Sequence, residues 1–262
     1  MTTPHLPFAV LALGLLRVAS AQEEGNGPAP WVIEKPATAD YETFVATARE
    51  RGWSDPRVEI EEALGRSPDA WRAELEQAET FHAEILAENE VDEDPARRDR
   101  VEGALDRIRP HCPWPDGVVE IRPVVLAGDV PNAYSTLGGR IYVTTAILEA
   151  VDDDELVFVL AHELAHQVAG HLGRKLALCL RLEAAADLAD DSREDVLRRY
   201  SRILEAEADA LALLWVRRTA TRVDAPVTLM RIFDRIEAER VDEALRARGE
   251  LRQRRIALDR AR

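Results

Sequence analysis

Two histidines four residues apart are the residues of this chain whose types and spacing best suit metal chemistry. His162 and His166 enclose the run Glu163-Leu164-Ala165. On an α-helix, side chains four residues apart are rotated by only about 40°, so both imidazoles can reach one ion. Glu163 lies about 100° round from His162, beside the metal, where it can take a proton from coordinated water. The spacing predicts two ligands and a general base for hydrolysis.

The residues around this motif favour a buried site over a surface helix that carries two unrelated histidines. An HExxH motif arises by chance in on the order of one or two in a hundred chains of this composition. The flanking apolar residues, which predict a helix buried on most sides, are Val157, Val159, Leu160, Leu164 and Val168. Two buried imidazoles and a buried carboxylate would be costly without a metal to satisfy them.

The third ligand must come from elsewhere, because catalytic zinc takes three protein ligands and leaves one position open. His171 follows His166 by five residues, whereas the extended motif HExxHxxGxxH requires six, so this pattern fails. The alternative is a carboxylate on a later helix, where Glu205 and Asp209 share one face. We therefore predict that Glu205 completes a site for one Zn²⁺ per chain. Asp209 is expected to orient a ligand from behind.

Several blocks of sequence occur in the order found in one known family. They are Asn132-Ala133-Tyr134, GGRIYVTT from Gly138, VLAHELAHQVAGH ending at His171, and YSRILEAEAD from Tyr200. Together they resemble peptidase family M48, zinc metallopeptidases of which this chain looks like a soluble exported bacterial type, over roughly residues 118–233. The resemblance implies a gluzincin-like core. We expect a mostly helical α+β fold with a small β-sheet beside the HExxH helix.

The resemblance also implies the activity and the substrate class. The protein is expected to be a zinc endopeptidase acting on polypeptides, specifically on misfolded or unassembled exported proteins. Residues 132–143 would form an edge that pairs with an extended peptide. On this interpretation Asn132, Ala133, Gly138 and Gly139 bind substrate. By spacing alone, an ordinary turn is the better interpretation of the two glycines.

One departure from the family concerns the oxyanion of the tetrahedral intermediate. Soluble bacterial members carry a His-Pro pair followed by an arginine near the C-terminus, but here the stretch reads RARGELRQRRIALDR, and no histidine follows His171. Loss of one oxyanion donor costs about a hundredfold to a thousandfold in turnover. An arginine or Tyr200 could substitute. The alternative function is a zinc-binding, chaperone-like module with little hydrolysis, which metal-dependent cleavage would distinguish from an enzyme.

The elements that must position these residues are mostly helices. Helical spacing of apolar residues occurs from Asp40, over 68–90, over 155–180, over 192–218 and from Pro226 onward. His82 lies on an apolar stripe and is interpreted as a core or boundary histidine, not as a ligand. A β-branched run at 118–128 predicts one strand. After the loop VPNAYSTLGG, a second strand at 140–144 is expected to run into a helix near Thr145.

Composition suggests four segments along the chain. Residues 1–21 read as a signal peptide, because the apolar run FAVLALGLL precedes Ala19-Ser20-Ala21. An uncleaved anchor is the alternative, but the run is too short to cross a bilayer. A Gly- and Pro-rich linker (22–39), an N-terminal helical region (40–110) and the metallopeptidase core (111–262) follow. We therefore expect export to the periplasm or secretion, with no stable membrane span after cleavage.

Charge and cysteine content limit the class of protein. A formal net charge of −15 argues against a nucleic-acid partner, because phosphate backbones are bound by clustered Lys and Arg. Cys112 and Cys179 are the only cysteines. A disulfide between them and two buried thiols are about equally compatible with their spacing.

Overall fold

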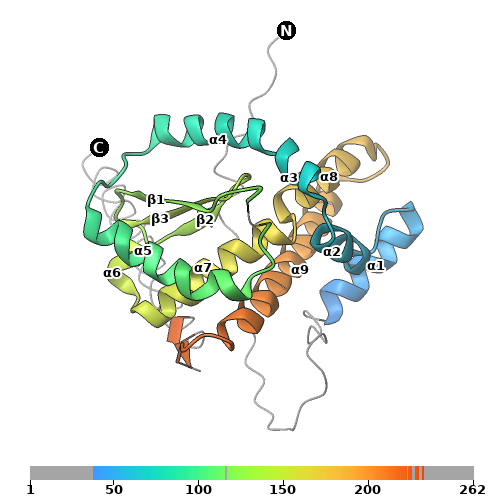
Figure 1. The fold of residues 1–262 in the computed structure, drawn as a ribbon. Coiled ribbons are helices and arrows are strands. Elements are labelled where there is room, and N and C mark those ends of the chain that lie inside the picture. Colours follow the sequence, from blue (N-terminus) through green and yellow to red (C-terminus); the bar gives the residue numbers. More distant parts are fainter. Residues whose placement is uncertain (1–37, 116, 223, 226–227, 230–231, 233–262) are drawn as a thin grey trace, which may run out of the picture.

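The computed structural model describes residues 38–115, 117–222, 224–225, 228–229 and 232 (Figure 1). The predicted signal peptide, nearly all of the linker and most of the helices expected after Pro226 lie outside this part. The elements are α1 (Thr38–Arg51), α2 (Pro56–Leu64), α3 (Pro68–Ala73), α4 (Leu75–Glu88), α5 (Pro95–Ile108), a 3₁₀ turn (Arg109–His111), β1 (Arg122–Leu126), β2 (Ala133–Ser135), β3 (Arg140–Thr144), α6 (Thr145–Ala150), α7 (Asp153–Val168), α8 (His171–Ala184) and α9 (Asp190–Val216). The predicted α+β class, mostly helical with a small sheet, is confirmed.

The sheet is mixed and has one open edge. Its strands lie in the order β1-β3-β2, with β1 parallel to β3 and β2 antiparallel to it. The outer edge of β1 is covered by a bridge between Val91 and Leu126. No further strand of the described part pairs with β2, which is therefore the open edge. The sequence predicted β1 and β3 but treated residues 133–135 as loop, because three residues are too few to show alternation.

Helix α7 carries the HExxH motif and forms the centre of the described fold. It begins with a capping box, in which the Asp152 side chain accepts from the N–H of Glu155 and the Glu155 carboxylate accepts from the N–H of Asp152. In Figure 1, α7 runs below the sheet and crosses α9. It packs against α5, α9 and β2. The apolar residues that flank the motif are buried, as predicted.

Two of the predicted helices are each divided in the structure. The stretch 155–180 separates into α7 and α8 at Gly170, which has a left-handed φ of 63° that glycine adopts readily. The stretch from Pro68 separates into α3 and α4 at Glu74, whose N–H bonds to the Trp71 carbonyl in a tighter turn. The break at Gly170 has a consequence for the site, because it lets His171 start a new helix beside His166.

The N-terminal helices share apolar clusters with the rest of the described fold. Phe44 of α1 packs against Tyr200 of α9, with ring centroids 4.8 Å apart. Trp71 and Leu105 belong to the same buried cluster as Leu160 of α7. His82 of α4 is half-buried and contacts the Tyr142 hydroxyl at 2.9 Å, which agrees with a boundary position and not with the core. The region before residue 110 therefore packs directly on the helices that carry the predicted ligands.

The turn between β2 and β3 admits no side chain at Gly139. Gly138 and Gly139 have φ values of 69° and 80°. A Cβ on Gly139 would lie 2.1 Å from the carbonyl oxygen of Glu120. The Gly139 N–H donates to Oε1 of Gln167 at 2.9 Å, and Nε2 of Gln167 donates to the Arg140 carbonyl at 3.0 Å. This turn therefore ties the hairpin to α7.

Gly139→Ala is expected to lower the free energy of unfolding by about 2 to 4 kcal/mol, because it adds both an unfavourable φ and a collision with backbone. Thermal unfolding followed by circular dichroism measures the loss. Gly117→Ala is the matched control, since Gly117 has a φ of 73° but nothing within 4 Å of a built Cβ. It should lose only about 1 kcal/mol. Equal losses in the two variants would contradict the close approach to Glu120.

Two further expectations can be compared with the structure. Cys112 and Cys179 are not joined by a disulfide, and both are half-buried, so they are two thiols but not the buried ones of the alternative. In the described part of the chain, no helix combines the length and the apolar character needed to cross a membrane.

Candidate metal centre and its pocket

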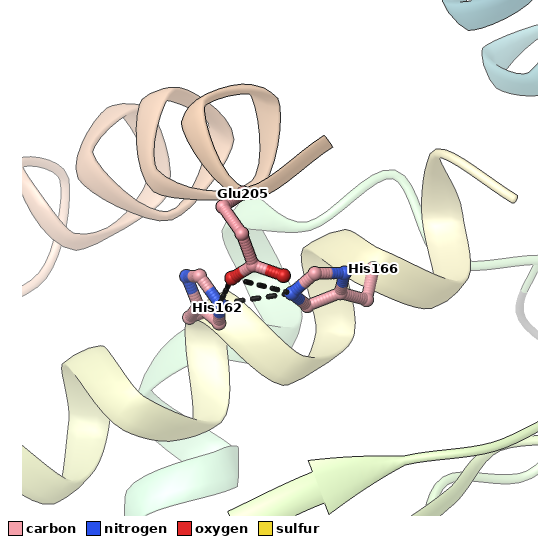
Figure 2. Close-up of side chains that lie close together, drawn as sticks. All are labelled: His162, His166 and Glu205. Carbon is pink, nitrogen blue, oxygen red and sulfur yellow. Dashed lines mark hydrogen bonds and ion pairs between the residues drawn. The ribbon is translucent and has the colours of Figure 1, made fainter. Parts of the chain in front are cut away.

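Three side chains from two helices converge on one point (Figure 2). His162 and His166 project from α7, and their Nε2 atoms lie 2.9 Å apart. Glu205 projects from α9 towards both imidazoles. Its Oε2 atom lies 3.3 Å from Nε2 of His162 and 3.6 Å from Nε2 of His166. The structure thus brings the three predicted ligands together.

The spacing of these donor atoms suits a divalent cation. When a tetrahedral zinc ion has its ligands about 2.1 Å away, neighbouring donor atoms are about 3.4 Å apart. The three observed separations lie around this value. Two imidazole nitrogens and one carboxylate oxygen also form one of the donor sets of catalytic zinc, with one position left for water or substrate. The residues present therefore fit a metal ion.

Asp209 lies behind His162, at the position expected for a residue that orients a ligand. Its Oδ1 atom lies 2.9 Å from Nδ1 of His162, a contact that fixes the orientation of a ligating imidazole. Burial opposes the charged form of His162, but the hydrogen bonds with Asp209 and Glu205 outweigh it and raise its pKa well above the usual value. Burial also opposes ionisation of Glu205, yet hydrogen bonds from both histidines lower its pKa. Glu205 therefore stays ionised, the form that binds a cation.

Glu163 lines the same pocket as the ligands but is separate from them. It is buried, and burial is the main cause that raises its pKa, against the opposing effect of His166 and His162. The hydroxyl of Ser135 donates to the backbone carbonyl of Glu163 at 2.9 Å. A carboxyl group with a raised pKa is closer to the range in which it exchanges protons readily. The position of Glu163 thus suits proton transfer beside the candidate metal centre.

A pocket of about 210 Å³ joins the metal ligands to the open edge of the sheet. Residues 131–137, which include all of β2, form one wall, so the structure places Asn132 and Ala133 at the pocket. Gly138 and Gly139 are not among the residues that line it and form the turn after β2. Of the four predicted substrate-binding residues, the structure therefore brings two to the pocket. The glycines have the turn role that their spacing alone indicated.

Arg66, from the N-terminal helical region, closes the end of α7 and lines the pocket. Its Nη2 atom donates to the carbonyl of Gln167 at 2.6 Å, and its Nη1 atom donates to Glu74 at 2.5 Å. A cation at a helix C-terminus satisfies carbonyls that lack a partner within the helix. Glu74 also lines the pocket. Residues before the predicted core thus contribute to the wall of the site, which the sequence did not indicate.

Two buried polar residues behind His166 were also missed. His171, rejected from the sequence as a ligand, places its Nδ1 atom 2.8 Å from Nδ1 of His166. Glu207, to which no role was assigned, lies 3.3 Å from Nε2 of His171. Burial, with Arg174 and His166 adding to it, lowers the pKa of His171 well below its usual value, so the imidazole is neutral. One feature of the sequence could have pointed to Glu207, namely that it is a glutamate on a largely apolar face of the helix predicted over residues 192–218.

Tyr200, one candidate to replace the missing oxyanion donor, lies elsewhere in the fold. It is buried, its hydroxyl donates to Glu59, and it does not line the pocket. The C-terminal stretch in which the family carries its His-Pro pair falls outside the described residues.

A sequence model described as "Peptidase family M48" matches residues 118–254, more than half of the chain. This match shows that the chain belongs to peptidase family M48, the family predicted from the motifs. The match begins after the 3₁₀ turn, so α1 to α5 lie before it.

Curated relatives are mitochondrial metalloendopeptidases. The mitochondrial metalloendopeptidase OMA1 of Schizosaccharomyces pombe is 33% identical over 128 residues, which cover 44% of this chain and 38% of the relative. The human mitochondrial metalloendopeptidase OMA1 is 32% identical over 123 residues, covering 37% and 24%. The Saccharomyces cerevisiae protein of the same name is 30% identical over 118 residues, covering 40% and 33%. The chain thus spans less than two fifths of the length of each of these relatives.

The predicted export to the periplasm or outside the cell is wrong by this comparison, because the relatives are mitochondrial. That prediction depended on residues 1–21, which lie outside the described part of the chain. An apolar run followed by small residues describes a leading segment in general terms. It does not by itself define the compartment that receives the protein.

Proposed function

Because the chain belongs to peptidase family M48, we propose that it is a zinc-dependent endopeptidase that hydrolyses peptide bonds. The observation that carries the proposal is the convergence of His162, His166 and Glu205 on one point beside Glu163. Two imidazoles and one carboxylate are typical ligands of catalytic zinc. Bound there, the ion supplies Lewis-acid chemistry, which polarises a carbonyl and acidifies water.

The residues of the chain supply the remaining chemistry. Glu163 takes a proton from the water that attacks the peptide bond and later delivers it to the leaving amine. Its raised pKa supports both steps, since the group must both accept and release a proton. Asp209 keeps His162 oriented throughout. His162 and Glu163 are buried and Asp209 is partly buried, so bulk water screens the electrostatic interactions among them less than it would at the surface.

We propose that the substrate is an extended polypeptide segment that adds to the open edge of β2. Unpaired backbone groups on an edge strand can hydrogen-bond to an added strand. The pocket that borders residues 131–137 also contains the candidate metal centre, which supports delivery of a peptide bond to it. Asn132 and Ala133 would contact the substrate directly. Gly138 and Gly139 would act by holding the hairpin against α7.

Removal of metal is expected to lower peptide cleavage by at least about a hundredfold, because the Lewis acid contributes several kcal/mol to catalysis. The measurement is cleavage of casein and of fluorogenic peptides by the full chain before and after dialysis against a chelator. Added Zn²⁺ should restore the rate. Equal cleavage with and without chelator, at a verified absence of metal, would overturn the proposal. Metal uptake with no cleavage of any peptide would instead favour the chaperone-like binding module.

A further inference from the structure

His166 is supported from behind in a different way from His162. His162 contacts the carboxylate of Asp209 directly. Behind His166 lies a second imidazole, because Nδ1 of His171 is 2.8 Å from Nδ1 of His166. Both rings are held edge to face, with centroids 4.8 Å apart and planes inclined by 81°. The orientation of His166 therefore depends on what fixes His171.

The direction of the hydrogen bonds follows from the partners of each nitrogen. Nε2 of His166 faces the other ligands, so its lone pair is needed there and its proton belongs on Nδ1. That N–H can donate to His171 only if Nδ1 of His171 is unprotonated. The proton of His171 then lies on Nε2 and donates to Oε2 of Glu207 at 3.3 Å. The chain of donors thus runs from the candidate metal centre to a carboxylate.

Glu207 is in turn fixed by Arg174. The two nitrogens Nη1 and Nη2 of Arg174 donate to Oε2 and Oε1 of Glu207 at 2.6 Å and 3.3 Å. The side chains are only 8% and 5% exposed. A buried carboxylate is costly without such partners, and a bidentate pair limits its rotation. Glu207 is therefore a fixed acceptor for His171.

The N-terminal helix α2 holds Arg174 from the opposite side. The Pro56 carbonyl accepts from Nη2 of Arg174 at 3.2 Å, and Glu59 lies 3.5 Å from its Nε atom. Arg181 also pairs with Glu59, at 3.3 Å, but makes no contact with Glu207 among the described interactions. Residues 56 and 59 precede the part of the chain that matches the family. The N-terminal helical region thus contacts the residues behind His166, although it lies outside the part of the chain that matches the family.

We propose that His171, Glu207 and Arg174 are positioning residues that hold His166 in the orientation required for metal binding, with α2 anchoring Arg174. The inference rests on the metal site of the proposed function. If the ion pair of Arg174 and Glu207 served only to join α8 to α9, no imidazole would be needed between this pair and His166. The contact of His171 with both His166 and Glu207 distinguishes the two roles. Substitution of a residue that hydrogen-bonds to a ligating histidine typically lowers metal affinity by about tenfold to a hundredfold.

The test compares Zn²⁺ affinity, measured by competition with a chelating dye, and the visible spectrum of the Co²⁺-loaded full chain. His171→Phe removes both hydrogen bonds and is expected to weaken Zn²⁺ binding by about tenfold to a hundredfold and to shift the Co²⁺ bands. His171→Gln keeps an acceptor and a donor and should recover at least part of the affinity. Arg174→Met should weaken binding, whereas Arg181→Met, which removes the other cation beside Glu59, should not.

The thermal stability of the metal-free variants separates positioning from folding. The proposal is overturned if His171→Phe and His171→Gln bind Zn²⁺ as tightly as the unsubstituted chain. It is also overturned if Arg174→Met and Arg181→Met lose equal affinity, or if the losses in affinity follow only the losses in metal-free stability. If Zn²⁺ affinity depends on His171 and Arg174 as expected but the chain cleaves no peptide, the proposed enzymatic function is overturned and the positioning role stands. Failure of the unsubstituted chain to bind any metal would overturn both.

Discussion

Exchange of Glu163 for glutamine is expected to lower peptide cleavage by about a hundredfold to ten-thousandfold while the protein keeps its metal. The amide has nearly the shape of the carboxylate but cannot take a proton from water. Glu163 is not one of the three converging ligands, so the loss should appear in turnover and not in metal content. Cleavage rate and zinc content are measured on the same preparation.

Glu155→Gln is the matched control for this variant. It makes the same chemical change on the same helix, at the N-terminal capping box, where glutamine also supports the box. Its cleavage rate per folded molecule should stay within about twofold of the unsubstituted chain, because two helical turns separate it from Glu163. Full activity of Glu163→Gln would rule out the carboxylate as the general base. Loss of metal from that variant would instead show that Glu163 helps to hold the ion.

Glu205→Ala is expected to abolish stable metal binding. Zinc-binding free energies of about 10 to 16 kcal/mol, divided among three ligands, make each worth about 3 to 5 kcal/mol, or more than a hundredfold in affinity. The two histidines of α7 remain in this variant, but the anionic donor from α9 is lost. Zinc per chain, measured by mass spectrometry after gel filtration, should fall from about one to below about one tenth. Cleavage should fall with it.

The control for Glu205→Ala is Glu194→Ala, an exposed position about three turns earlier on the same helix. It should keep its zinc and its cleavage rate. Because Glu205 is the ligand most distant in sequence from the motif, its variant is the most demanding test of the site. Retention of one zinc per chain in Glu205→Ala would mean that another group completes the ligand set, and the geometry in Figure 2 would then not describe the bound state.

The local sequence was sufficient to predict the relative positions of side chains wherever these depend on the geometry of a single helix. The relation between His162, Glu163 and His166 follows from helical rotation alone. The burial of His162 and Glu163 follows from apolar neighbours that recur around the helix, whereas His166 is half-buried. Glu205 and Asp209 share a face of α9 for the same reason, because residues four apart on one helix lie on the same side. Their order along α9 also agrees with the roles proposed for them, since Glu205 faces both histidines and Asp209 lies one turn further on, against His162. Among the described residues, predictions of this kind failed at Glu74 and Gly170, where a helix is interrupted.

Contacts between distant segments could not be predicted in this way. The three residues of β2 are a strand because β3 pairs with them, and Gly139 lacks a side chain because Glu120 approaches it. The cellular compartment of the protein could not be predicted for a different reason, because neither the composition of residues 1–21 nor the described fold defines it.

The sequence by itself identified the groups that carry the proposed chemistry, namely two imidazoles and a carboxylate for a metal and a second carboxylate for proton transfer. Only the tertiary structure decided what holds them in place. His171 and Glu207 are 36 residues apart and meet because α8 folds back onto α9 after Gly170. Arg66 reaches the end of α7 across 101 residues. Such contacts depend on how whole helices pack, and helical periodicity shows which face of a helix is buried but not which residue it will meet.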